Sequence, residues 1–114
     1  MLRTNLKHIE TVEEFKNLIE SGKKTVVVCG RMGPMCIPVY DVMESFESKY
    51  PDINFRDMEF DSNVAIQTIR SLPEVRNFAG LPFTVYFRDG KVAAATSSIQ
   101  NKQQVKEILD TKLV

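Results

Sequence analysis

Residues 25–29 restrict the folds open to this chain more than any other segment. Their sequence, Thr-Val-Val-Val-Cys, is uncharged and mostly β-branched, which is typical of a strand buried on both faces. Apolar residues at helical spacing flank this run, with Phe15, Leu18 and Ile19 before it and residues 39–46 after it. A buried strand between two amphipathic helices indicates an α/β protein built on a parallel sheet.

The same alternation continues along the chain. Strands are predicted at residues 6–10, 25–29, 53–60, 83–87 and 92–96, and helices at residues 11–21, 36–50, 61–72 and 101–113. Asp89-Gly90 lies between the last two strands and marks a hairpin turn. The predicted order is therefore β-α-β-α-β-α-β-β-α, with a mixed central sheet flanked by helices and an antiparallel edge.

The charge balance and the lack of long apolar runs exclude several classes of protein. Lys and Arg total 15 and Asp and Glu total 15, so the chain lacks the basic excess of proteins that bind nucleic acids or anionic membranes. No apolar run approaches the roughly 20 residues of a transmembrane helix, and residues 1–8 lack the core of a signal peptide. We therefore expect one domain, residues 1–114, that is a cytoplasmic monomer without nucleic-acid or membrane partners.

The chain has two cysteines, Cys29 and Cys36. Two are too few for a disulfide framework, and they lack the companion ligands of a zinc site, so we expect neither a metal nor a cofactor. Cys36 begins a predicted helix, where unpaired N–H groups favour the reactive thiolate. Arg31 adds positive potential if its side chain points inward. The alternative interpretation is that Cys36 is a small buried hydrophobic residue.

Three segments resemble the thioredoxin family. Residues 8–15 are similar to its first strand and helix, and residues 33–39, Gly-Pro-Met-Cys-Ile-Pro-Val, resemble its Ala-Pro-Trp-Cys-Gly-Pro-Cys motif. Residues 80–92 resemble its Gly-Ile-Pro-Thr strand and the hairpin that follows. The resemblance covers nearly the whole chain from Leu6, and it implies the thioredoxin fold and thiol–disulfide exchange.

The resemblance also implies a role for each matching position. Cys36 takes the place of the nucleophilic cysteine, Pro38 of the motif proline, and Pro82 of the cis-proline beside the thiol. Val39 occupies the position of the resolving cysteine, and Gly30 that of a buried aspartate that assists proton transfer. The motif therefore implies a single active thiol in place of a dithiol pair.

A substrate groove is expected around this thiol. Met35 replaces the motif tryptophan, and we expect it to line the groove together with Ile37 and Leu81. The backbone of Leu81 would offer strand-like hydrogen bonds to an extended peptide. A rival alignment places residues 32–35, Met-Gly-Pro-Met, on the family motif, which leaves no catalytic thiol and gives Pro38 no role.

Three residues outside the motif leave alternatives open. Cys29 is a candidate resolving thiol, but a core strand is a poor position from which to reach Cys36. Asp57 lies on the neighbouring strand where the family often has a lysine, and it is either a substitute proton acceptor or a strand carboxylate in partial solvent. His8 is expected to be a surface strand residue without a metal to bind.

Thiol–disulfide exchange through Cys36 is the leading functional hypothesis. Its partners would be protein disulfides or thiols, with a reductase or a low-molecular-weight thiol releasing the mixed disulfide. The main alternative is a redox-inactive interaction module that keeps the groove. A monothiol glutaredoxin-like iron–sulfur carrier is a weaker alternative, because the glutathione-binding pattern of that family is not recognised here.

Overall fold

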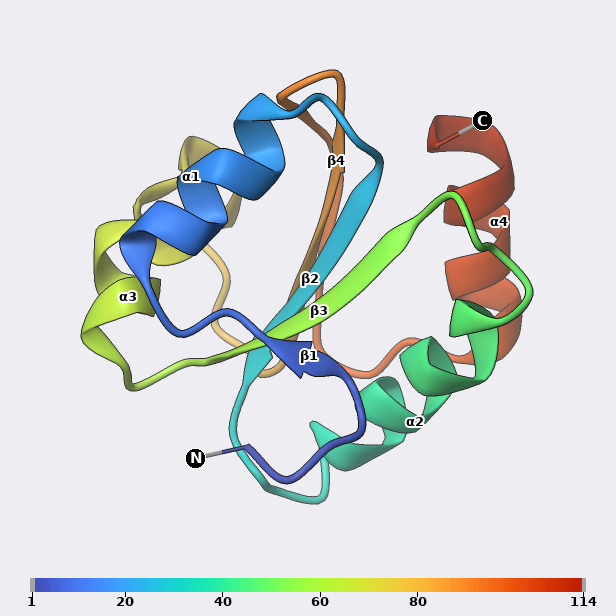
Figure 1. Cartoon of the computed structure of the whole chain (residues 1–114). Coiled ribbons are helices and arrows are strands. Elements are labelled where there is room, and N and C mark those ends of the chain that lie inside the picture. Colours follow the sequence, from blue (N-terminus) through green and yellow to red (C-terminus); the bar gives the residue numbers. More distant parts are fainter. Residues whose placement is uncertain (1, 114) are drawn as a thin grey trace.

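The computed structural model describes residues 2–113, and five strands of that range form one mixed sheet (Figure 1). Parallel pairing joins β1 to β3 and β3 to β2, whereas β4 is antiparallel to both β2 and β5. The predicted parallel core with an antiparallel edge is therefore confirmed. The strands, in their order across the sheet, are β1 (Lys7–His8), β3 (Asn54–Glu59), β2 (Thr25–Gly30), β4 (Phe83–Arg88) and β5 (Lys91–Ser97).

The central strand β2 is buried along its whole length. Its side chains alternate between two hydrophobic clusters, with Val26 and Val28 in one and Val27 and Cys29 in the other. Because successive side chains of a strand point to opposite faces, one β-branched run supplies both layers of the core.

Two helices cover each face of the sheet. Figure 1 shows α1 (Val12–Glu20) and α3 (Asn63–Gln67) on one side, and α2 (Ile37–Glu47) and α4 (Lys102–Lys112) on the other. The predicted caps are present: the Thr11 side chain accepts the N–H of Glu14, and Asn101 and Gln104 form a reciprocal capping box. These local signals explain why both helices begin where the sequence predicts.

The third helix is shorter than predicted. It was expected to run to about Leu72, but α3 ends at Gln67 and gives way to short 3₁₀ turns at Ile69–Ser71 and Pro73–Val75. The Thr68 hydroxyl donates to the carbonyl of Val64, and the Thr68 backbone leaves the helical region at ψ −92°. A side-chain hydroxyl that bonds to a nearby carbonyl competes with the backbone hydrogen bonds of a helix. Pro73 has no N–H with which to continue those hydrogen bonds.

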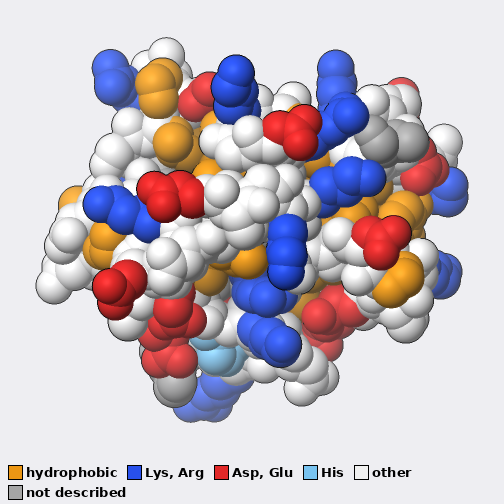
Figure 2. All heavy atoms as spheres, turned by 45° about the horizontal axis from the view of Figure 1, so that its top comes forward, with side chains coloured by type: hydrophobic (Ala, Val, Ile, Leu, Met, Phe, Trp, Pro, Cys, Tyr) orange, Lys and Arg blue, Asp and Glu red, His pale blue; other side chains and the backbone are white. Residues whose placement is uncertain are grey.

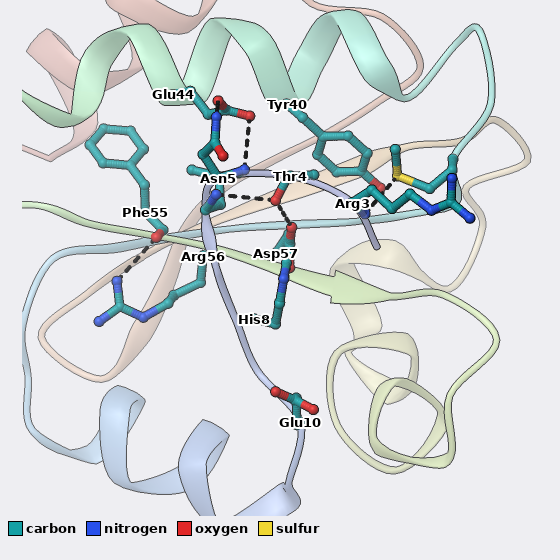
Figure 3. Close-up of polar contacts among 12 residues, drawn as sticks. Arg3, Thr4, Asn5, His8, Glu10, Tyr40, Glu44, Phe55, Arg56 and Asp57 are labelled. Carbon is teal, nitrogen blue, oxygen red and sulfur yellow. Dashed lines mark hydrogen bonds and ion pairs between the residues drawn. The ribbon is translucent and has the colours of Figure 1, made fainter. Parts of the chain in front are cut away.

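The first strand is also shorter than the predicted residues 6–10, since only Lys7–His8 pair with β3, and residues 2–6 take another path. Leu2 and Leu6 are buried in the α2–α4 layer of the core. The Leu6 N–H donates to the Thr4 hydroxyl instead of to a neighbouring strand, and Asn5 donates to the side chain of Glu44 on α2 (Figure 3). This N-terminal segment, residues 2–6, therefore joins α2 to the sheet, and only Lys7–His8 pairs as β1.

Charges of both signs are mixed over the molecular surface. Figure 2 shows Lys and Arg side chains interspersed with Asp and Glu side chains over the face it presents. Among residues 2–113, no helix combines the length and the apolar character that crossing a bilayer requires.

Candidate functional site

Cys36 lies at the N-cap of α2. Its N–H and that of Ile37 both donate to the Gly33 carbonyl, each at 3.0 Å, so a tight turn leads the chain into the helix. Pro38 lies in the first helical turn, where its missing N–H costs little and its fixed φ suits the helix. The residues Gly33 to Pro38 therefore hold the cysteine at the beginning of α2.

Gly30 and Pro82 bring two further segments against the Cys36 sulfur. The Leu81–Pro82 peptide bond is cis, and β4 begins directly after it. A Cβ atom built on Gly30 would lie 2.9 Å from Cys36 Sγ and 3.0 Å from Pro82 Cβ. The end of β2, the start of β4 and the start of α2 thus converge on one point, and glycine at position 30 permits this approach.

Tyr40 also lies at this point, although the sequence pattern did not identify it as a site residue. Its Oη lies 2.8 Å from the same Gly30 Cβ point, and the residue is only 1% exposed. The hydroxyl donates to the Arg31 carbonyl at 3.1 Å. Burial raises the pKa of Tyr40, so the group remains a protonated donor at neutral pH. Its spacing of four from Cys36 places both residues on one face of α2, which is the signal that could have identified it.

Arg31 contacts the thiol through its backbone. The Arg31 N–H donates to Cys36 Sγ at 3.4 Å. Its guanidinium instead forms two hydrogen bonds of 2.8 Å with Asp61 and lies over the Phe60 ring, 5.2 Å from its centroid. These bonds hold the pKa of the Asp61 carboxyl below its usual range. The side chain therefore does not point inward as the sequence analysis allowed; the hydrogen-bond donor to sulfur is the main chain.

The three predicted groove residues differ in their exposure to solvent. Met35 is 46% exposed and Ile37 40% exposed, whereas Leu81 is partly buried against the core. Cys36 itself is only 3% exposed. The residue is therefore largely shielded from solvent, and a reagent reaches the sulfur when neighbouring atoms move aside.

Cys29 lies on the other side of the sheet. Its side chain packs in the layer with Ile69 and Phe83, whereas Cys36 belongs to the layer under α2 and α4. Both thiols are free. Burial raises the pKa of Cys29, which disfavours its thiolate. The structure therefore does not bring this candidate resolving thiol to Cys36.

Asp57 contacts Thr4 of the N-terminal segment and His8 of β1. The residue is completely buried on β3, so it is not the partly solvated carboxylate of one interpretation. It accepts a hydrogen bond from the Thr4 hydroxyl, and its Oδ1 lies 2.5 Å from His8 Nδ1 (Figure 3). Burial raises the pKa of Asp57, against the opposite effect of these two contacts. Among residues 2–113, no three His, Cys, Asp or Glu side chains are grouped to hold a metal ion.

The raised pKa of Asp57 predicts an unusual pH dependence of stability. Because the folded state holds this proton more tightly than the unfolded chain, stability conferred at acidic pH is lost as the pH rises through the folded pKa. Relative to Asp57→Asn, the wild type should therefore become less stable as the pH increases from about 4. Urea unfolding of both proteins at a series of pH values measures the difference. If the wild type instead gained stability relative to Asp57→Asn as the pH rose, the raised pKa of Asp57 would be contradicted.

Comparison with known proteins places this geometry in a known architecture. No protein-family model matches the sequence, and no curated protein matches it. Among solved structures, the thioredoxin of Plasmodium falciparum matches with a TM-score of 0.73 and 17% identity, over 92% of this chain and 97% of that chain. Oxidised mitochondrial thioredoxin 3 of Saccharomyces cerevisiae matches with a TM-score of 0.72 and 21% identity, over 92% of this chain and 94% of that chain. Oxidised thioredoxin O2 of Arabidopsis thaliana matches with a TM-score of 0.73 and 15% identity, over 96% of this chain and 95% of that chain. The chain is therefore thioredoxin-like in fold, as its sequence resemblance predicts.

Proposed function

We propose that this protein exchanges thiols and disulfides through Cys36 as its single active thiol. The observation that carries the proposal is the environment of the sulfur, which receives the Arg31 N–H at the start of α2 and lies beside Pro82. In the first step, the Cys36 thiolate attacks a disulfide R–S–S–R′. A mixed disulfide Cys36–S–S–R forms, and R′–S⁻ leaves.

An external thiol completes the cycle. Val39, at the place of a resolving cysteine, carries no sulfur, and Cys29 lies on the opposite face of the sheet. A second thiolate R″–S⁻ therefore attacks the mixed disulfide at the sulfur of R. R–S–S–R″ forms and the Cys36 thiolate is released, so that atoms and electrons balance. A low-molecular-weight thiol or a reductase supplies this second thiolate.

The substrate side of the reaction is a protein disulfide or thiol. Met35 and Ile37 flank Cys36 in the chain and expose apolar side chains, and Leu81 directly precedes the cis-Pro82 that leads into β4. These features support recognition of an extended peptide that carries a disulfide. A reducing compartment such as the cytoplasm supplies the external thiols that this cycle needs.

Reaction with an aromatic disulfide, 5,5′-dithiobis(2-nitrobenzoate), tests the proposal. The native Cys29→Ser protein should release one thiolate and gain one adduct at Cys36, faster than the same protein unfolded in urea. Cys36→Ser, the matched control, should give no native adduct. Addition of a monothiol should then remove the adduct, which mass spectrometry follows.

A redox-inactive interaction module is the second candidate, and the burial of Cys36 favours it. In that case the native thiol would react more slowly than the thiol of the unfolded chain, because folding only shields it. The comparison of native and unfolded rates therefore decides between exchange and a purely interacting groove.

A further inference from the structure

Resting on the exchange function proposed above, we infer that Tyr40 is a positioning residue for Cys36. Its hydroxyl holds the Arg31 carbonyl, and this contact aims the Arg31 N–H at the sulfur. The N–H is then the donor that stabilises negative charge on the sulfur during exchange.

Two hydrogen bonds form the connection. Tyr40 donates to the Arg31 carbonyl at 3.1 Å, and the Arg31 N–H reaches Cys36 Sγ at 3.4 Å. The carbonyl and the N–H lie on either side of the same α-carbon. Fixing the carbonyl therefore restricts the rotation that would turn the N–H away from the sulfur.

The loop between β2 and α2 needs such an anchor. Residues 31–36 have no regular secondary structure, and the side chains of Met32 and Met35 are exposed. Tyr40, in contrast, is buried on a helix and packed in the core, so its position is well defined. Figure 3 shows its ring pointing from α2 toward the sheet. A rigid helical residue thus orients a donor in an irregular loop.

The chemistry gives this donor a purpose at two points. Negative charge resides on Cys36 Sγ before it attacks a disulfide, and again when it leaves the mixed disulfide. Hydrogen bonds to a charged acceptor are stronger than those to a neutral one, so the Arg31 N–H favours both charged states. Tyr40 can maintain this arrangement because its buried hydroxyl remains protonated and donates.

Gly30 leaves the space that Tyr40 occupies. The Tyr40 Oη and Cys36 Sγ atoms lie 2.8 and 2.9 Å from the point where a Cβ of residue 30 would stand. A side chain at that position would therefore displace the hydroxyl, the sulfur or both. The glycine and the tyrosine are two parts of one arrangement.

The test compares Tyr40→Phe with Tyr86→Phe, both in the Cys29→Ser background. Tyr86 is a matched control because it is buried in the same cluster and its hydroxyl has no hydrogen-bond partner within residues 2–113. The readout is the rate of Cys36 alkylation by iodoacetamide across a range of pH. Tyr40→Phe should slow alkylation about three- to tenfold at neutral pH, the effect expected for one hydrogen bond, and should move the pH–rate profile to higher pH. Tyr86→Phe should change neither.

Two results would overturn the inference. One is an unchanged alkylation profile in a folded Tyr40→Phe protein. The other is an equal change in both variants, which would indicate a general loosening of the core. Alkylation requires no disulfide substrate, so the inference is tested even if the exchange assay shows no turnover. An exchange assay without turnover would reject only the proposed function.

Discussion

A Val39→Cys protein should release its mixed disulfides without an external thiol. Residue 39 lies one helical turn from Cys36, and its N–H donates to the Cys36 carbonyl at 3.0 Å. Cα atoms one turn apart fall within the 4.4–6.8 Å range that a disulfide accepts. The substitution also replaces a fully buried valine with another small apolar residue, so the core should tolerate it.

The expected gain follows from effective concentration. A tethered thiol acts at a concentration on the order of millimolar, so at ~10 μM external thiol the release should be about a hundredfold faster. The measurement is the decay of a preformed Cys36 adduct with 2-nitro-5-thiobenzoate, followed by its absorbance. Mass spectrometry should then find an internal disulfide, with the loss of two hydrogens.

Val42→Cys is the matched control for this experiment. Val42 is also an α2 valine packed against the core, but it lies six residues from Cys36, a rise of about 9 Å along the helix, which is too far for a disulfide. Its adduct should decay at the wild-type rate and depend on added thiol. If Val39→Cys also keeps the wild-type dependence on thiol, the first turn of α2 does not have the geometry described here.

Replacement of Gly30 with alanine should lower the free energy of unfolding. The new Cβ would lie 2.8 Å from Tyr40 Oη, 2.9 Å from Cys36 Sγ and 3.0 Å from Pro82 Cβ. All three neighbours are packed, and overpacking of this kind costs about 1–3 kcal/mol. The more restricted unfolded chain returns only about 0.4–1 kcal/mol, so the net change should be destabilising.

Gly33→Ala provides the control for this prediction. Gly33 lies in the adjoining loop, but a Cβ built on it meets nothing within 4 Å, and its φ is not in the left-handed region. Urea unfolding should show Gly33→Ala at or slightly above wild-type stability and Gly30→Ala clearly below it. Gly30→Ala should also slow the alkylation of Cys36. Equal stability of the two variants would contradict the convergence at Gly30.

The fold was largely predictable because its signals are local or periodic. The β-branched run of β2, the caps at Thr11 and Asn101, and the Asp89-Gly90 turn each act within a few residues. The early end of α3 was missed because apolar spacing continues past Gln67, whereas the hydroxyl of Thr68 interrupts the backbone. Periodicity reports which face is buried, but it does not report such competition for a carbonyl.

The site was predictable only in part, because its contacts come from distant segments. The positions of Cys36 and Pro38 on α2 follow from sequence pattern. The proposed role of Tyr40 depends on the missing side chain at Gly30, which lets the Tyr40 hydroxyl approach the backbone there. The partners of Asp57 are Thr4, which precedes the predicted first strand, and His8, which lies within it. Such contacts are set by tertiary packing, which propensity and spacing do not encode.

Because the two cysteines lie on opposite faces of the sheet, their labelling rates report on two different layers of the core. Cys29 is sealed in the layer under α1 and α3, and Cys36 in the layer under α2 and α4. Each thiol is modified only when its own layer opens, so the two labelling rates describe two separate local fluctuations of one sheet. A ligand that settles on the α2 side would protect one cysteine and leave the other unchanged, without any added probe.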